Sequence, residues 1–414
     1  MLLRARIVLP ISSPPIADGA VLISGNRVTA LGRWNEFSSA AGKSVTDLGP
    51  VILMPGLVNA HCHLDYTDMG GQPAPKQFPD WIKGLLARKA AASYADYAQA
   101  WLRGAAMLVR TGVTTVADIE AVPELLPDVW SSTPLRVCSF LEMTGVRSGR
   151  DAAAIVQEAA AKINSLRPKR GFTGLSPHAP YSTMPALWQG AAQEAGRHQW
   201  RVTMHLAETI DELEMYLHCR GPLFDWLKNQ RDMSDCGQGT PVQQIRRSGL
   251  LGERFLAIHA NYLQPADVAA LAESGSSVVH CPRSHAYFRH EPFLYDELVA
   301  AGVNVCLGTD SLASVIPERA PGPELNLFTE MQTFAGAHPG VSPSVILRLA
   351  TCNGARALGL QGSVGEIAPD SFADLIAIPF SGTMEEADSA VVHFGGKVER
   401  SMTDGRWESL AQPG

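Results

Sequence analysis

The feature of this sequence that most restricts its fold is an alternation of short apolar runs with longer helical stretches. The intervening stretches, such as 151–166 and 185–195, are rich in alanine, leucine and glutamate. Parallel strands need helical crossovers between them, so this alternation predicts an α/β fold, most simply a closed (β/α)8 TIM barrel. About eight apolar runs carry the pattern, at 54–60, 114–118, 136–141, 174–176, 201–204, 255–258, 277–279 and 303–307.

Both ends of the chain are rich in strand-like segments instead. Residues 20–24 and 27–32 flank a Gly25-Asn26 turn, a pattern typical of a β-hairpin. We therefore expect the two termini to pair with each other in one small sheet. In the C-terminal part, further strands are expected at 373–378, 390–394 and 397–402.

A chain of 414 residues is long enough for a barrel and a smaller domain. We expect residues 1–54 and 366–414 to form a small β-sandwich domain, and residues 55–365 to form the barrel. Pro55 and Gly56 usually interrupt strands, and they precede the first barrel run. We interpret them as the point where the chain crosses from the small sheet into the barrel.

Composition and charge exclude several classes of partner. The net charge is −7 and the basic residues form no stripe, so neither nucleic acid nor an anionic membrane surface is expected to bind. No window reaches the roughly 18 unbroken apolar residues of a spanning helix, and the start lacks the basic segment of a signal peptide. The seven cysteines include no C-x-x-C pair, which is typical of reduced thiols. We expect a cytoplasmic protein; the sequence leaves open whether it forms a homo-oligomer.

Histidine is the residue that most often follows the apolar runs. In a TIM barrel the chemistry gathers at the carboxyl ends of the strands, so these residues are the candidate site. Residues two apart on a strand point the same way, so His61 and His63 can bind one cation, although a plain polar pair at a strand end would look the same. The polar residues at the ends of successive runs are His61, His63, His178, His205, His259, His280 and Asp310.

The order of these residues, H-x-H, then His, His and Asp on later strands, resembles the amidohydrolase superfamily. The segments 54–60, 351–359 and 365–375 are similar to the family as well, so the resemblance covers nearly the whole chain. A glutamate three residues after the fifth-strand histidine, here Glu208 after His205, resembles the aromatic-amine deaminases. These include the deaminases of 5'-methylthioadenosine and S-adenosylhomocysteine, and of aminodeoxyfutalosine.

The resemblance implies one divalent metal ion per chain, with zinc expected and Fe²⁺ or Mn²⁺ as alternatives. Its ligands would be His61, His63, His205 and Asp310. The fourth run ends without a lysine, so the carbamylated-lysine form of the family's site is not indicated. Glu142, near the end of the third run, is either a ligand of a second metal or a supporting carboxylate.

The resemblance also implies hydrolytic removal of ammonia from an amino-substituted heteroaromatic ring, such as that of a purine nucleoside. Asp310 would act as general base and His259 would orient the attacking water. Glu208 would protonate a ring nitrogen, unless it is only a solvated carboxylate at the start of the next helix. The substrate is expected to be an adenosine derivative or aminodeoxyfutalosine.

Three residues are expected to bind the substrate. His178 resembles a substrate-contacting histidine of the adenosine-type deaminases. Asp80 and Trp81, within 78–86, are similar to a segment that covers the pocket, where the acid binds ribose hydroxyls; the alternative is a helix N-cap followed by a core tryptophan. His285 stands where relatives have asparagine, so a detail of the pocket differs.

Two other functions stay open at this point. A chlorohydrolase or cyclic amidohydrolase would use the same fold and metal, but Glu208 and His178 favour a deaminase. A non-catalytic scaffold would not need the complete set of metal ligands.

Overall fold

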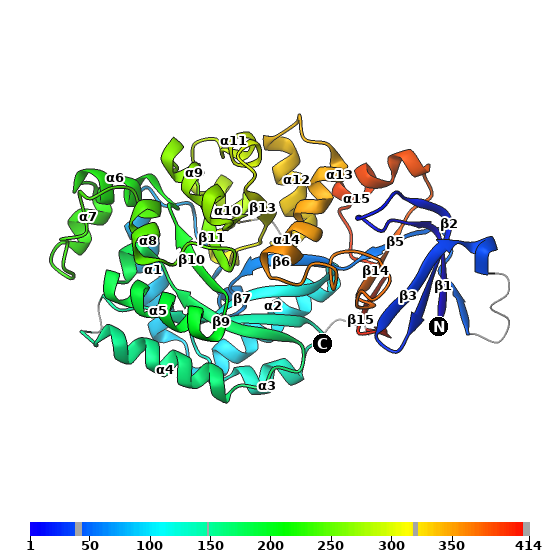
Figure 1. Cartoon of the computed structure of the whole chain (residues 1–414), viewed down its shortest axis with the longest axis horizontal. Helices are drawn as coiled ribbons and strands as arrows, with labels where there is room; N and C mark the ends of the chain where they lie inside the picture. The colour runs from blue at the N-terminus through cyan, green and yellow to red at the C-terminus, as the bar shows by residue number, and fades with distance from the viewer. Residues whose placement is uncertain (38–43, 147–148, 318–321, 409–414) are drawn as a thin grey trace.

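The largest part of the molecule is a closed barrel of eight parallel strands, seen on the left of Figure 1. The computed structural model describes residues 1–37, 44–146, 149–317 and 322–408. Neighbouring strands pair in chain order, which confirms the predicted (β/α)8 barrel. The barrel strands are β6 (Leu57–Cys62), β7 (Val113–Glu120), β8 (Arg136–Met143), β9 (Gly171–Pro177), β10 (Val202–Leu206), β11 (Phe255–His259), β12 (Ser277–His280) and β13 (Asn304–Leu307).

The barrel closes where the end of β13 meets β6. Thr309 donates its backbone N–H to the carbonyl of His61 at 3.0 Å, and the Asn59 side chain bonds both the amide and the hydroxyl of Thr309. A Cβ on Gly308 would lie 2.9 Å from the Cβ of His61, so only glycine allows this approach. The closure brings the first and last barrel strands, and the polar residues that follow them, together.

Helices connect the strands and cover the barrel. The helical segments expected near 151–166 and 185–195 are found as α4 and α5, where Asp151 caps the first and Pro185 begins the second. The helices of this part are α1 (Phe78–Ala91), α2 (Tyr94–Arg110), α3 (Leu126–Ser131), α4 (Ala152–Ser165), α5 (Pro185–His198), α6 (Ile210–His218), α7 (Pro222–Leu227), α8 (Pro241–Ser248), α9 (Pro265–Ser274), α10 (Pro282–Phe288), α11 (Tyr295–Ala300), α12 (Leu327–Ala337), α13 (Pro343–Leu349) and α14 (Cys352–Ala357).

A second sheet, on the right of Figure 1, combines strands from both ends of the chain. Its order is β16-β15-β14-β5-β1-β2-β3, with β4 paired to β1, and the expected hairpin is β2 and β3. The predicted domain boundaries stay predictions, and residues 409–414 lie outside the described chain. The strands are β1 (Leu2–Val8), β2 (Ile16–Ser24), β3 (Arg27–Arg33), β4 (Val45–Asp47), β5 (Val51–Pro55), β14 (Leu375–Pro379), β15 (Arg400–Thr403) and β16 (Arg406–Trp407).

The chain crosses between the two sheets at Pro55 and Gly56. Strand β5 ends at Pro55 in the second sheet, and β6 begins at Leu57 in the barrel. A Cβ on Gly56 would lie 2.1 Å from Oγ1 of Thr114, so the crossing needs glycine. The interpretation of this dipeptide as a crossing point is confirmed.

One expected C-terminal strand is wrong. The segment 390–394 was predicted to be extended, but helix α15 (Ala387–Val392) occupies most of it. Ala387, Val391 and Val392 are buried, at helical spacing, against the core. Packing of this face outweighs the strand preference of the paired valines.

A buried ion pair joins the barrel to the second sheet. Arg136, at the start of β8, donates to Asp374 at 3.1 and 3.2 Å and to Asp404 at 2.9 Å. The Arg136 and Asp374 side chains are 6% and 1% exposed, so losing one partner would leave a charge in the interior.

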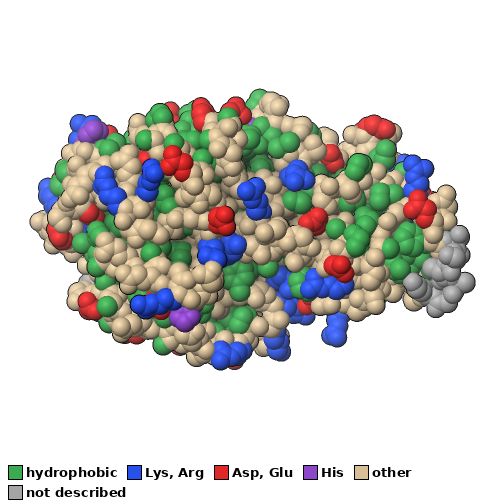
Figure 2. Space-filling model, viewed as in Figure 1, with side chains coloured by type: hydrophobic (Ala, Val, Ile, Leu, Met, Phe, Trp, Pro, Cys, Tyr) green, Lys and Arg blue, Asp and Glu red, His purple; other side chains and the backbone are tan. Residues whose placement is uncertain are grey.

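Two surface properties bear on the expected partners. On the face shown in Figure 2, basic and acidic side chains are interspersed. Among the described residues, no helix has both the length and the apolar character needed to cross a bilayer.

Candidate functional site

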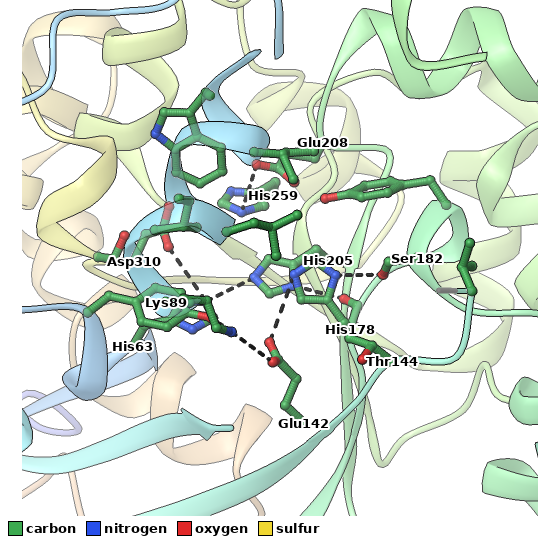
Figure 3. Close-up of a pocket in the computed structure, with 18 of the residues that line it drawn as sticks. His63, Lys89, Glu142, Thr144, His178, Ser182, His205, Glu208, His259 and Asp310 are labelled. Carbon is green, nitrogen blue, oxygen red and sulfur yellow. Dashed lines mark hydrogen bonds and ion pairs between the residues drawn. The ribbon is translucent and has the colours of Figure 1, made fainter. Parts of the chain in front are cut away.

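A cavity of about 360 Å³ lies at the carboxyl ends of the barrel strands (Figure 3). Its walls come from six barrel strands or the loops after them, and from α1 and α7. The cavity therefore occupies the place where a TIM barrel carries its chemistry. The lining residues are His63, Tyr66, Trp81, Ile82, Leu85, Leu86, Lys89, Glu142, Thr144, Val146, His178, Tyr181, Ser182, His205, Glu208, Trp226, Leu227, His259, Asp310 and Ser311.

Four predicted metal ligands converge beside this cavity, and three of them, His63, His205 and Asp310, line it. Nε2 of His63 lies 3.2 Å from Nε2 of His205, and Nε2 of His61 lies 3.5 Å from Oδ1 of Asp310. In each of two overlapping groups, the donor atoms lie within 4.8 Å of one another: His61 with His63 and His205, and His61 with His259 and Asp310. Three imidazole nitrogens and a carboxylate oxygen are a donor set that suits a divalent transition metal.

Neighbouring groups orient these donor atoms toward one point. Nδ1 of His205 donates to the carbonyl of His178 at 2.8 Å, which leaves the Nε2 lone pair free to bind a cation. Oδ2 of Asp310 accepts the hydroxyls of Ser284 and Ser314, both at 2.7 Å. The remaining Oδ1 therefore faces the histidines.

The electrostatics favour the protonation states that metal binding requires. Burial lowers the pKa of His63 and of His259 to about 3, and lowers that of His205 as well, so all three are neutral. Burial alone would raise the pKa of Asp310, but the nearby imidazoles of His61, His259 and His63 hold it well below its usual value. Neutral imidazoles and an ionised carboxylate are the ligand forms.

Unpaired atoms and backbone strain concentrate at the same place. Both ring nitrogens of His61 are buried without a hydrogen-bond partner, which is costly unless a cation or another group binds there. Left-handed backbone, rare outside glycine, occurs at Ala207, His259, Ala260 and Asp310, with φ between 49° and 72°. Such strain costs on the order of 1–3 kcal/mol per residue and persists where a site requires it.

Glu208 and His259 lie together on the wall beside this cluster (Figure 3). Oε1 of Glu208 is 3.7 Å from Nε2 of His259. The Glu208 backbone is fixed at both ends, because Glu212 accepts its N–H at 2.8 Å and Asn261 donates to its carbonyl at 2.9 Å. Burial, with Asp310 and Glu212 nearby, raises the pKa of Glu208 well above its ordinary value and so favours the protonated form of this side chain.

The three predicted substrate contacts are placed differently from one another. His178 lines the cavity, and its Nδ1 is 2.7 Å from Oγ of Ser182. Trp81 lines it too, and its Nε1 donates to the carbonyl of Ala313. Asp80 is not brought to the cavity: its side chain is 59% exposed and pairs with Lys83. The N-cap of α1 is Gln77, so the alternative interpretation of Asp80 as N-cap is also not supported.

Sequence reasoning missed Lys89 and its neighbours. Lys89 extends from α1 to Glu142 at the end of β8, with 3.3 Å between Nζ and Oε2, and it also donates to the Tyr66 hydroxyl. The signal was present in α1. The α1 residues that line the cavity recur at helical spacing, so a lysine on the same face of the helix points into the cavity. The α1 residues on this wall are Trp81, Ile82, Leu85, Leu86 and Lys89.

Glu142 does not join the metal-ligand cluster. Neither group of converging donor atoms found among the described residues includes it. Its Oε2 faces an ammonium instead, and a second cation there would be repelled by Lys89. The geometry supports the interpretation of Glu142 as a carboxylate outside the metal centre.

Comparison with known proteins gives a family and a fold. The model of the amidohydrolase family matches residues 52–407, and this confirms the resemblance read from the strand-end motifs. An aminodeoxyfutalosine deaminase of Deinococcus radiodurans is 30% identical over 83% of this chain and 82% of its own length. A 5-methylthioadenosine/S-adenosylhomocysteine deaminase of Moorella thermoacetica is 28% identical over 91% and 85%.

Among solved structures, a zinc-bound adenosine deaminase of Xanthomonas campestris superposes with a TM-score of 0.84. The superposition covers 98% of this chain and 92% of that one, at 24% sequence identity. At this identity the likeness shows the fold alone.

Proposed function

This chain belongs to the amidohydrolase family, and from that premise we propose that it is a metal-dependent hydrolytic deaminase. The reaction releases ammonia from an amino-substituted heteroaromatic ring, and the substrate is an adenosine-like nucleoside. Relatives named as deaminases of aminodeoxyfutalosine and of 5-methylthioadenosine support this substrate class. The observation that carries the proposal is the buried Glu208 carboxyl beside the converging histidines.

The residues that would hold the metal are His61, His63, His205 and Asp310, with one divalent ion per chain. Zinc fits this set of three nitrogens and one oxygen, and iron or manganese are the alternatives. The unpaired nitrogens of His61 support the fit, because a bound cation would satisfy them. When bound, such an ion supplies Lewis-acid activation of a water molecule.

Asp310 and His259 are the residues that would handle that water. Oδ1 of Asp310 is the carboxylate oxygen not bonded to a serine, so it can accept a proton. Neutral His259, 3.7 Å from Glu208, can orient the water by hydrogen bonding. Both side chains are held by strained backbone at the ends of their strands, which fixes their directions.

Glu208 would supply the proton that makes a ring amine reactive. An amino-substituted aromatic ring resists attack until a ring nitrogen is protonated, and a carboxyl that keeps its proton near neutral pH can donate it. Burial raises the pKa of Glu208 and so favours its protonated form. Hydrolysis of a simple amide would not need such an acid.

The test is a substrate panel assayed for ammonia with the metal-loaded protein. The panel contains adenosine, 5'-methylthioadenosine, 5'-deoxyadenosine, aminodeoxyfutalosine, guanine and cytosine, together with a cyclic amide and a chlorinated triazine. We expect ammonia from at least one adenosine derivative. Turnover of the amide or the triazine, with no ammonia from any ring amine, would reject the proposal in favour of another hydrolase of this fold.

A further inference from the structure

The cavity wall away from Glu208 carries a buried ion pair, labelled at the lower part of Figure 3. Nζ of Lys89 lies 3.3 Å from Oε2 of Glu142 and also donates to the hydroxyl of Tyr66. The Lys89 and Glu142 side chains are 20% and 7% exposed. Burial alone would raise the pKa of Glu142, but the Lys89 ammonium beside it lowers the pKa to about 2, so the carboxyl is ionised.

Only one oxygen of Glu142 is used by this pair. Its other oxygen, Oε1, is buried and has no hydrogen-bond partner, and it faces Nε2 of His178 at 3.9 Å. Nδ1 of His178 lies 2.7 Å from Oγ of Ser182, which is also 3.2 Å from the carbonyl oxygen of Ala179. A buried carboxylate oxygen needs a hydrogen-bond donor, so Oε1 of Glu142 is available to a donor that enters the cavity.

We propose that Glu142 is the specificity-determining residue for the part of the substrate remote from the reacting amine, where its free oxygen accepts hydrogen bonds from hydroxyl groups of a nucleoside sugar. This inference rests on the proposed function and deepens it. Lys89 is a positioning residue, because it holds the other oxygen of Glu142 and neutralises its charge.

Asp80, the residue expected from sequence to bind such hydroxyls, faces solvent and does not line the cavity. It is 59% exposed, pairs with Lys83 and is absent from the lining residues. Glu142 and Glu208 both line the cavity, and the metal-ligand cluster lies between them in Figure 3. A substrate whose ring nitrogen meets Glu208 can therefore extend its sugar toward Glu142.

The experiment compares adenosine with 2',3'-dideoxyadenosine, which lacks the hydroxyl donors. For the metal-loaded wild type, we expect kcat/KM for adenosine to exceed that for the dideoxy compound by about 10- to 100-fold, the range for a charge-assisted hydrogen bond. Glu142→Met, which removes both acceptors at similar volume, should bring the ratio close to one. Glu142→Gln keeps one neutral acceptor and should give an intermediate ratio.

A matched control uses an ion pair at the surface. Nζ of Lys162 lies 3.3 Å from Oε1 of Glu124, the same separation as in the cavity pair. Glu124→Gln should therefore leave the ratio at its wild-type value. Lys89→Met should lower the ratio through misplacement of Glu142, and Lys89→Arg should restore part of it. A merely structural role of Lys89 would lower kcat/KM for both substrates equally.

The outcomes separate this inference from the proposed function. If wild type deaminates adenosine and both Glu142 variants keep the wild-type ratio, Glu142 does not bind the sugar and the inference is overturned while the function stands. A wild type that releases ammonia from no ring amine would overturn both. A ratio that collapses only in the Glu142 and Lys89 variants supports the assignment.

Discussion

The replacement of Glu208 by glutamine tests the proposed role of this residue as the proton donor to the substrate ring. Glutamine has nearly the same shape as glutamic acid but cannot donate a carboxyl proton to a ring nitrogen. The side chain should stay in position, because Glu212 and Asn261 hold the backbone of residue 208 at 2.8 and 2.9 Å. The variant therefore removes the acid and leaves the shape of the cavity.

The size of the expected effect follows from burial. General acid catalysis contributes about 10²- to 10⁴-fold, or about 3–5 kcal/mol of barrier. Glu208 is 4% exposed, so bulk water cannot readily replace it as the proton donor. We expect kcat to fall by about 10³- to 10⁴-fold, in the upper part of that range. KM should change much less, because the lost interaction is made mainly in the transition state.

The assay is ammonia release with the best substrate of the panel, together with metal content by elemental analysis. Glu208→Gln should contain as much metal as wild type, since residue 208 is outside the ligand set. Wild-type kcat in the variant would refute the role of Glu208 as acid. Loss of the metal together with activity would show instead that Glu208 is a ligand.

Three further predictions follow from the same geometry. Asp310→Asn should abolish turnover and lower the metal content measured by elemental analysis, whereas wild-type values would exclude Asp310 as ligand and base. Burial raises the pKa of Glu212 to about 8 from an ordinary 4.5. The contribution of this carboxyl to folding stability is therefore complete below pH 4.5 and is lost as the pH rises toward 8. The melting temperature of Glu212→Gln should depend less on pH between 4.5 and 8 than that of the wild type, and an equal pH dependence would contradict this prediction. Arg136→Met should destabilise the protein by about 3–5 kcal/mol in urea unfolding because it leaves Asp374 buried and unpaired, and a loss below about 1 kcal/mol would show that the pair is dispensable.

The fold could be predicted because its signals are periodic and local. Alternation of strand and helix predicted the barrel, and Gly56 and Gly308 show why the crossing and the closure need those residues. The prediction for 390–394 was wrong because tertiary packing, and not local strand preference, determines the structure of this segment. Its valines, which are typical of a strand, lie on the buried face of a helix. Periodicity does not report which neighbour will cover a short apolar run.

The site was predictable where residues follow strand ends, and less so where they come from helices. His61, His63, His205 and Asp310 converge because the carboxyl ends of the barrel strands meet at one rim. Lys89 lies in the last turn of α1, where a lysine is usually solvated, and only the packing of α1 over the cavity turns it inward. Asp80, by contrast, was predicted at the site but lies outside it, because its position in the first turn of α1 faces solvent.

The most direct test of the account is a crystal structure of the metal-loaded protein with anomalous scattering measured at the edge of the bound metal. We predict one ion per chain, about 2.0–2.2 Å from a ring nitrogen of His61, His63 and His205 and from Oδ1 of Asp310. A protein that takes up no ion, or binds its ion beside Glu142 and away from these four side chains, would contradict the account.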